Sequence, residues 1–252
     1  MPKHLENATI LQNRKVAEGM YEITLSSPTI AAIAKPGQFL HVRVSDAVAP
    51  LLRRPISIAD VTLDRIVLIY RTIGKGTEVL SQRKAGETIS LLGPLGRGFP
   101  IDKLEGKRTL LIGGGVGIAP LIYVANRVGC SDILMGGRTK EDLFWTTYYG
   151  ACEDIYITTD DGSMGIKGFT VDALPKILSD KKYDAICTCG PEIMMKRVAE
   201  IAKEYQVPCY VSLEKHMACG LGACLSCTCE AKDGTRKKVC SHGPVFLAEE
   251  VF

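Results

Sequence analysis

Four cysteines fall within eleven residues near the C-terminus, in the stretch CGLGACLSCTC from Cys219 to Cys229. A fifth, Cys240, completes the spacing Cys219-x4-Cys224-x2-Cys227-x12-Cys240. A C-x4-C-x2-C run followed by a more distant cysteine is the plant-type 2Fe–2S arrangement. The spacing therefore predicts a 2Fe–2S cluster with ligands Cys219, Cys224, Cys227 and Cys240, and leaves Cys229 as a bystander.

The residues between these cysteines suit a loop that wraps a compact cluster. Gly220 and Gly222 let the backbone turn and direct N–H groups at sulfur atoms. Asp233-Gly234 is a strong hairpin signal, and such a hairpin would return Cys240 to the loop. A tetrahedral zinc site and a set of structural thiols are the alternatives. Zinc sites usually pair two C-x2-C knuckles, and this chain has one.

The remaining composition limits the compartment and the partners. The N-terminal residues MPKHLENATILQNRK lack the apolar core of a signal peptide, so we expect a cytoplasmic protein without disulfides. The net charge of +3 is too small to argue for nucleic acid or an anionic membrane. The most apolar stretch, TLLIGGGVGIAPLIYVA, is broken by glycines and proline and is not expected to span a membrane. The cysteines outside the cluster motif, expected as small buried hydrophobes, are Cys130, Cys152, Cys187, Cys189 and Cys209.

The hydrophobic pattern changes at about Lys107. Before it, the stretches MYEITLSS, GQFLHVRVS, RIVLIYRTIG and ETISLLGPLG predict the short strands of a barrel. After it, predicted strands alternate with helical stretches such as PEIMMKRVAEIAKEY, which indicates βαβ units and a parallel sheet. We therefore predict an α+β multidomain protein. Its parts are an antiparallel β-barrel over residues 1–102, a Rossmann-like α/β domain over 103–208 and a small cluster-binding segment over 209–252.

A glycine-rich loop, GGGVGIAP from Gly113 to Pro120, follows a predicted strand and opens a predicted helix. Glycines let the backbone approach a pyrophosphate, and the start of the next helix supplies N–H groups. The loop departs from G-x-G-x-x-G at Ile118, and a plain tight connection is the alternative. Its strand–loop–helix context favours a nucleotide site.

Two stretches of the predicted barrel carry phosphate-binding chemistry. RRPISIAD begins with Arg53 and Arg54, whose planar forks match phosphate, and Ser57 offers a hydroxyl to a ring system. IYRTIGKGT ends in a Gly-x-Gly-Thr run that would present backbone amides to a diphosphate. The alternatives are a solvated edge strand capped by Pro55 for the first stretch and a simple turn for the second.

In combination these motifs resemble a known group of flavoproteins. R-x-[YI]-[ST] in a barrel, then G-x-G-T, GGGxGxAP and CGPEIMM, resembles the ferredoxin–NADP reductase superfamily. LLRRPISIAD, LLGPLGRGFP, ACGLGACLSC and HGPVF are similar to the electron-transfer subunits of class 1B dihydroorotate dehydrogenases, so the resemblance covers nearly the whole chain. His242, where an acidic residue is common, and the extra Cys229 are small departures that leave the ligand positions intact.

The resemblance implies FAD, NAD and a 2Fe–2S cluster on the four cysteines already named. It places FAD at Arg54, Pro55, Ile56, Ser57, Ile69, Tyr70, Arg71, Gly76 and Thr77. It places NAD at Gly113, Gly114, Gly115, Val116, Gly117 and Pro120, with Cys189, Gly190 and Pro191 beside the nicotinamide. A buried thiol at a strand end is the alternative interpretation of Cys189.

The resemblance also implies a function as an NAD-linked oxidoreductase subunit. Two electrons would leave dihydroorotate at the FMN of a separate catalytic subunit, cross singly through the cluster to FAD, and reach NAD as a hydride. The two subunits would form a heterotetramer of two of each. No Ser/His/Asp, paired-carboxylate or metal-hydrolase set appears in the sequence, so we predict no catalytic side chain beyond the cofactor sites. Asp160 and Asp161 would repel a 2′-phosphate and favour NAD over NADP, whereas Arg138 argues the other way.

Two other functions stay open at this stage. The small subunits of NADH-dependent ferredoxin:NADP oxidoreductases share this layout, but they usually carry aspartate at the position of Cys219 and R-x-P-L-T in place of RRPIS. A zinc-binding regulator that keeps a nucleotide fold is the alternative from a different class. Met217, Leu221 and Leu225 lie on or beside the cysteine loop, where they would either contact a partner or cover the cluster.

Overall fold

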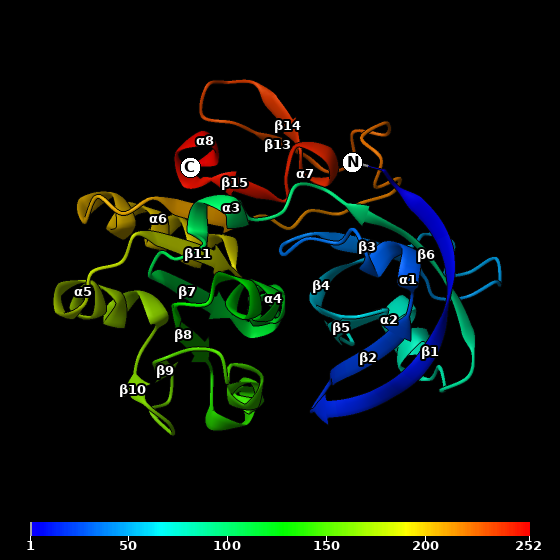
Figure 1. Cartoon of the computed structure of the whole chain (residues 1–252), viewed down its shortest axis with the longest axis horizontal. Coiled ribbons are helices and arrows are strands. Elements are labelled where there is room, and N and C mark those ends of the chain that lie inside the picture. The colour runs from blue at the N-terminus through cyan, green and yellow to red at the C-terminus, as the bar shows by residue number, and fades with distance from the viewer. Residues whose placement is uncertain (1) are drawn as a thin grey trace.

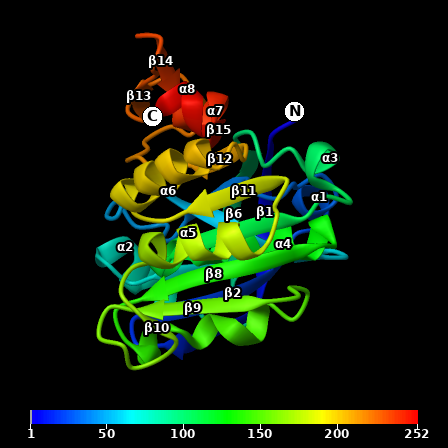
Figure 2. The same ribbon diagram turned by 90° about the vertical axis from the view of Figure 1, so that its left-hand side faces the viewer.

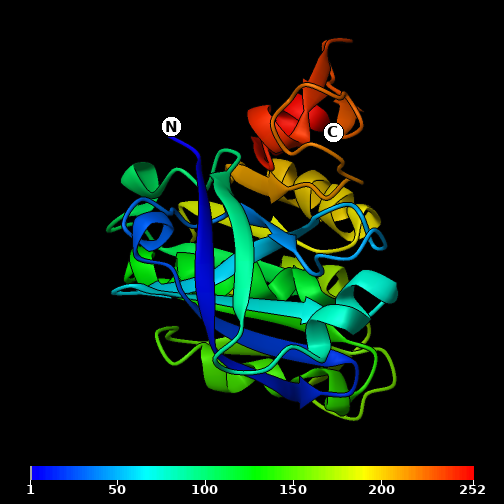
Figure 3. The ribbon, with the colours of Figure 1, turned by 90° about the vertical axis from the view of Figure 1, so that its right-hand side faces the viewer.

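The N-terminal part of the chain is a closed antiparallel barrel with the strand order β1-β2-β5-β4-β3-β6 (Figure 1). The computed structural model describes residues 2–252. The barrel strands are β1 (His4–Ala17), β2 (Met20–Ser26), β3 (Phe39–Arg43), β4 (Arg54–Thr62), β5 (Arg65–Arg71) and β6 (Thr88–Leu95). Two short helices, α1 (Pro28–Ala31) and α2 (Lys75–Ser81), lie between strands. Strand alternation turns Leu40, Val42, Ile56 and Ile58 into the barrel, where they are buried. Pairing of β1 with β6 closes the barrel (Figure 3).

The second part is a seven-stranded sheet in the order β10-β9-β8-β7-β11-β12-β15, parallel except for β15. Its elements before the C-terminal segment are α3 (Ile101–Leu104), β7 (Thr109–Gly114), α4 (Ala119–Val128), β8 (Ser131–Gly137), β9 (Ile155–Thr159), β10 (Ile166–Lys167), α5 (Thr170–Asp180), β11 (Ala185–Cys189), α6 (Glu192–Glu204) and β12 (Cys209–Ser212). Helices α5 and α6 cover the outer face, and α4 lies on the face toward the barrel (Figures 1 and 2). This arrangement confirms the predicted Rossmann-like α/β part. Within residues 2–252, no helix has the length and apolar character needed to cross a membrane.

The barrel and the sheet share one packed junction. Helix α4 lies against β4, and the Tyr123 hydroxyl donates to the Ala34 carbonyl oxygen at 3.1 Å. The Tyr148 hydroxyl donates to Glu22 of β2 at 2.7 Å, and the same carboxylate accepts from Arg14 at 2.8 Å. Apolar side chains from both parts form one core at this boundary. The two parts are therefore held in a fixed relation on either side of α4.

The C-terminal segment contacts both other parts. It contains β13 (Thr228–Glu230), β14 (Arg236–Lys238), α7 (Val239–His242), β15 (Val245–Leu247) and α8 (Ala248–Val251). The Arg97 backbone N–H, just after β6, donates to the Gly243 carbonyl at 2.5 Å, while β15 pairs with β12 of the sheet. The sheet thus includes β12 and β15, both from beyond the predicted boundary at residue 208. The boundaries of the three parts stay predictions.

The predicted Asp233-Gly234 hairpin is confirmed. Strands β13 and β14 pair antiparallel, and Gly234 at the turn has φ +77°, a conformation that favours glycine. The Asp233 side chain accepts from the backbone N–H of Thr235 at 2.9 Å and fixes the turn. This hairpin brings Cys240 back beside Cys227, whose sulfur accepts its backbone N–H at 3.4 Å.

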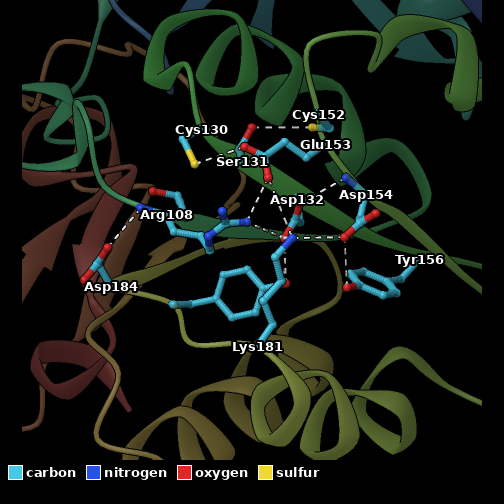
Figure 4. A network of polar contacts seen from close by, with 12 residues as sticks. Arg108, Cys130, Ser131, Asp132, Cys152, Glu153, Asp154, Tyr156, Lys181 and Asp184 are labelled. Carbon is cyan, nitrogen blue, oxygen red and sulfur yellow. Dashed lines mark hydrogen bonds and ion pairs between the residues drawn. The ribbon is translucent and has the colours of Figure 1, made fainter.

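A polar network ties the amino-terminal ends of the parallel strands together (Figure 4). The buried Asp132 carboxylate lies 2.7 Å from Lys181 Nζ and accepts the Tyr183 hydroxyl at 2.7 Å. Burial by itself would raise the pKa of the Asp132 carboxyl group. The hydrogen bonds from Lys181 and Tyr183 together have the larger effect, and they lower this pKa. Arg108 pairs with Glu153 at 2.8 Å at the same edge. The network is paired internally and lies at the end of the sheet opposite the glycine-rich loop, so it serves as a structural clamp.

Candidate functional site

The glycine-rich loop and the CGP turn lie together at the carboxyl ends of two adjacent strands. Strand β7 passes at Gly115 into a 3₁₀ turn (Gly115–Ile118) that leads to α4, and the neighbouring β11 ends at Cys189. A Cβ on Gly117 would lie 2.6 Å from the Cys189 carbonyl oxygen and 2.6 Å from the Gly190 nitrogen. Only glycine permits this approach, and a dinucleotide binds at such a sheet edge in the Rossmann-like folds.

The structure thus brings the predicted residues Gly113, Gly114, Gly115, Val116 and Gly117 beside Cys189, Gly190 and Pro191. Pro120 differs from the rest, because it is buried in the first turn of α4. Burial raises the pKa of the Cys189 thiol to about 12, so the thiol is protonated at neutral pH. Its packing favours the interpretation of Cys189 as a strand-end thiol that shapes the turn.

Charges at the ends of β8 and β9 lie at the same edge of the sheet. Asp161 is exposed, and its carboxylate accepts from the backbone N–H and the hydroxyl of Ser163 at 2.9 Å and 2.6 Å. The Ser163 hydroxyl and then its N–H lower the pKa of Asp161. Arg138, the opposing charge, lies 3.5 Å from Asp142. The net charge at this edge therefore disfavours an added phosphate.

On the barrel, Arg54 and Gly76 meet although they come from different elements. A Cβ on Gly76 would lie 2.2 Å from Arg54 Nε and 2.5 Å from Nη2, so the guanidinium rests against the glycine backbone. Thr77 secures the same loop, because its hydroxyl donates to the Gly74 carbonyl oxygen and accepts the Ile73 N–H, both at 3.0 Å. An arginine fork held against a glycine backbone is a suitable cradle for the diphosphate of FAD.

The other predicted flavin residues are divided between the two faces of the barrel wall. Ile56 and Tyr70 point into the barrel, where the Tyr70 hydroxyl donates to Asn13 at 3.1 Å. Ser57 and Ile69 alternate with them, and Ile69 packs in the core shared with α4. Pro55 precedes Ile56 at the start of β4, and Arg71 ends β5 with its side chain exposed. A flavin on the outer face would therefore contact Ile56 and Tyr70 through their backbone only.

The four predicted cluster ligands form two pairs. Cys219 Sγ accepts the backbone N–H groups of Leu221 at 3.3 Å and Cys224 at 3.4 Å, and Cys227 pairs with Cys240. Burial opposes ionisation of Cys219, but these N–H donors outweigh it and lower the pKa of the thiol to about 6. Burial raises the pKa of Cys240 to about 11. Cys227 and Cys240 lie in the core, whereas Cys224 is exposed.

Two thiol pairs suit a binuclear centre, because a 2Fe–2S cluster has two irons, each with two protein ligands. Cys229 lies outside both pairs on β13, opposite Lys237. The assignment of the individual ligands stays a prediction.

The cysteine loop exposes apolar side chains beside Cys224. Leu221 and Leu225 are 45% and 62% exposed, while Met217 is half-buried against the core. Leu225 also has a φ of +63°, which is unusual for a non-glycine residue. Because Met217 is half-buried, it is placed to cover the cluster. The exposed Leu221 and Leu225 are placed to contact a partner.

Sequence reasoning missed His41, which lies under the cysteine loop. Its imidazole is fully buried on β3, and a Cβ on Gly220 would lie 2.8–3.0 Å from three of its ring atoms. Burial and then the nearby Arg53 charge lower the pKa of His41 to about 4. The available signal was its place in FLHVR, where Leu40 and Val42 face the barrel interior and His41 must therefore face outward.

Comparisons with known proteins agree with this geometry. Residues 214–252 match the family model described as the iron-sulfur cluster binding domain of dihydroorotate dehydrogenase B. The dihydroorotate dehydrogenase B (NAD(+)) electron transfer subunit of Bacillus velezensis is 42% identical, with 96% of this chain and 97% of that protein covered. The same subunit of Geobacillus thermodenitrificans is 40% identical, with 98% of each covered.

Solved structures show the same architecture. One, reported for an NADH-dependent reduced ferredoxin-NADP oxidoreductase, has a TM-score of 0.87 and 34% identity, and the match covers 97% of this chain and 89% of that one. A ferredoxin NADP+ reductase from Neisseria gonorrhoeae, with bound FAD and NADP, shares the fold at a TM-score of 0.65 and 18% identity, over 80% of this chain and 91% of that one. The chain is thus 40% to 42% identical to these two subunits over nearly its whole length, and its iron–sulfur segment and its fold agree with them. It therefore belongs to the family of dihydroorotate dehydrogenase B (NAD(+)) electron transfer subunits.

Proposed function

We propose that this chain carries electrons from an FMN-containing dihydroorotate dehydrogenase catalytic subunit to NAD+, by way of a 2Fe–2S cluster and FAD. The observation that carries this proposal is the contiguity of the three candidate sites. The cysteine loop rests on β3, β3 pairs with β4 of the flavin cradle, and β4 packs on α4 behind the glycine-rich loop. Each site is one element away from the next.

The residues of each site have distinct tasks in this scheme. Arg54 beside Gly76 would hold the diphosphate of FAD, and Gly113–Gly117 would admit the pyrophosphate of NAD. The buried pair Cys227 and Cys240 would shield one side of the cluster from water. When bound, the cluster supplies single-electron transfer and the flavin supplies the exchange between single electrons and a hydride.

The exposed part of the cysteine loop is the face we assign to the partner. Cys224 with Leu221 and Leu225 brings a cluster ligand and apolar side chains to one surface loop. An electron relay needs its cluster edge close to the donor, and contact with a partner would bury both leucines. We propose a heterotetramer of two subunits of each kind. We place the chain in the cytoplasm, a reducing compartment that suits its ten cysteines.

The first test uses the isolated chain loaded with FAD and the cluster. We expect it to oxidise NADH with ferricyanide as the artificial acceptor, yet to leave dihydroorotate unchanged. Addition of the FMN catalytic subunit should restore dihydroorotate-dependent NAD+ reduction. Turnover of dihydroorotate by this chain alone, in a preparation free of FMN protein, would contradict the proposal.

A second candidate function is supported by the 0.87 TM-score to the NADH-dependent reduced ferredoxin-NADP oxidoreductase structure. The chain has fewer identical residues with that structure, 34%, than with the dihydroorotate subunits, 42% and 40%. Cys219 and Ser57 also favour the dihydroorotate subunit. Restoration of activity by the FMN catalytic subunit, and not by ferredoxin with NADP+, separates the two functions.

The charge at the ends of β8 and β9 predicts the choice of nucleotide. We expect kcat/KM for NADH to exceed that for NADPH by about fivefold or more, because a carboxylate near a 2′-phosphate costs on the order of 1 kcal/mol in a partly screened site. Asp161→Asn should reduce this ratio several-fold, whereas Asp180→Asn, at the exposed end of α5, should leave it unchanged. A higher kcat/KM for NADPH in the wild-type protein would refute the assignment.

A further inference from the structure

His41 is a buried polar group without a hydrogen-bond partner. Its exposed fraction is 0%, and within the described chain neither Nδ1 nor Nε2 has a donor or an acceptor. A buried imidazole is normally hydrogen-bonded, since its polar atoms lose their water on burial. Two unused ring nitrogens beneath a cofactor loop therefore indicate that a bound group completes the site.

The ring of His41 lies directly against the cysteine loop. A Cβ on Gly220 would be 2.8 Å from Cε1, 2.9 Å from Nδ1 and 3.0 Å from Nε2 of the imidazole. Gly220 has a φ of +68° and follows Cys219, whose sulfur accepts two backbone N–H groups of the same loop. A side chain at position 220 would push the loop off the ring, so the contact depends on glycine at this position.

His41 also lies next to the strand of the flavin cradle. In the pairing of β3 with β4, His41 lies opposite Pro55 and Phe39 lies opposite Ser57. The centroid of the Phe39 ring is 5.8 Å from the centroid of the imidazole. His41 therefore stands between the strand that carries the predicted flavin motif and the loop that carries the predicted cluster ligands. Its link to the flavin strand runs through backbone pairing, whereas its ring atoms touch the loop itself.

The backbone at His41 is held in place. Arg53 Nη1 donates to the His41 carbonyl oxygen at 3.2 Å and to the Ser90 carbonyl oxygen at 2.8 Å. Arg53 Nη2 adds a third hydrogen bond, to Ser90 Oγ at 2.9 Å. This clamp keeps β3 against β6 and fixes the backbone position from which the buried imidazole meets the cysteine loop.

We propose that His41 is a positioning residue of the electron path, and that one of its ring N–H groups donates a hydrogen bond to a sulfur of the 2Fe–2S cluster. Reduction of the cluster adds one electron and one negative charge, and it makes or breaks no bond to His41. A hydrogen bond to sulfur stabilises that added charge and raises the reduction potential of the cluster. Because this role presupposes the cluster of the proposed function, its test must first show that the cluster is present.

The decisive experiment compares His41→Phe with the wild type, both as full-length protein loaded with cluster and FAD. Phenylalanine keeps an aromatic ring in the same space and removes the donor. At a solution potential where half of the wild-type cluster is reduced, we expect the reduced-to-oxidised ratio in His41→Phe to fall at least threefold, with the flavin potential unchanged. His216→Phe, an exposed histidine of the same segment, is the matched control and should titrate as the wild type does.

A second measurement is made on the wild-type protein, so it does not depend on the folding of His41→Phe. Wild-type protein labelled with ¹⁵N-histidine should show a nitrogen hyperfine coupling in the pulsed EPR spectrum of the reduced cluster, and His216→Phe should retain it. An equal ratio in His41→Phe and wild type, or a shift confined to the flavin, would overturn the role of His41, as would a reduced cluster without histidine coupling. Lack of any 2Fe–2S signal in the wild-type protein would instead count against the proposed function.

Discussion

Cys224→Ser is expected to abolish the EPR signal of the reduced 2Fe–2S cluster while FAD stays bound. Cys224 forms one of the two thiol pairs, and its backbone N–H also donates to Cys219 Sγ at 3.4 Å. The flavin cradle of Arg54 and Gly76 lies on separate elements, so the substitution leaves it intact. In the assembled complex, dihydroorotate-dependent NAD+ reduction should fall about 100-fold or more, since even loss of an outer-shell partner costs 10–100-fold in activity at metal sites.

The control for this result is Cys229→Ser, in the same segment. Cys229 lies on β13 outside both thiol pairs, so its substitution should leave the cluster signal and the activity unchanged. NADH oxidation with ferricyanide should persist in both variants, because that reaction uses only the nucleotide and flavin sites. An unaltered cluster spectrum in Cys224→Ser would sink the ligand assignment.

Gly76→Ala is expected to weaken FAD binding by about 10-fold to 100-fold. The new Cβ would lie 2.2 Å from Arg54 Nε, so the guanidinium must leave its place beside the loop. Loss of a charge-assisted hydrogen bond costs about 1.5–3 kcal/mol, which corresponds to that range of Kd. The Kd is measured by titrating FAD into the flavin-free protein and following the quenching of flavin fluorescence.

Gly74→Ala is the matched control two residues earlier in the same loop. A Cβ there meets nothing within 4 Å, and the extended backbone of Gly74, with φ 173°, accepts alanine. We expect its FAD affinity to stay within about twofold of the wild type, in the range of a neutral surface substitution. Equal affinities for Gly76→Ala and the wild type would show that Arg54 and Gly76 do not hold the flavin.

Local patterns predicted much of the fold and of the site. The cysteine spacing indicated the cluster, and Asp233-Gly234 indicated the hairpin that returns Cys240, because both are written in short stretches. The change from alternating strands to strand–helix repeats near Lys107 indicated the barrel and the parallel sheet. Each of these signals lies within a short stretch of sequence. In this chain the tertiary packing keeps the local structure that each stretch favours.

Long-range contacts were not predictable from such patterns. Alternation along β3 places His41 on the outer face of the barrel, but no local signal says that Gly220 will cover it. The short stretch Val245–Leu247 has no period of its own, so its pairing with β12 required the assembled sheet. The flavin motif likewise does not say which of its residues would face FAD with their side chains, because adjacent strand residues such as Ile56 and Ser57 face opposite sides.

The pairing of β15 with β12 has a consequence for the solubility of the chain. Strand β12 would otherwise be the outer edge of a parallel sheet, with unpaired N–H and C=O groups open to strands of other molecules. The strand that covers this edge begins only five residues after Cys240, at Val245, and is followed by the last helix of the described chain. Edge protection is thus supplied by the same segment that carries the cysteine loop. The C-terminal segment therefore has a structural task, the covering of a sheet edge, that is separate from electron transfer.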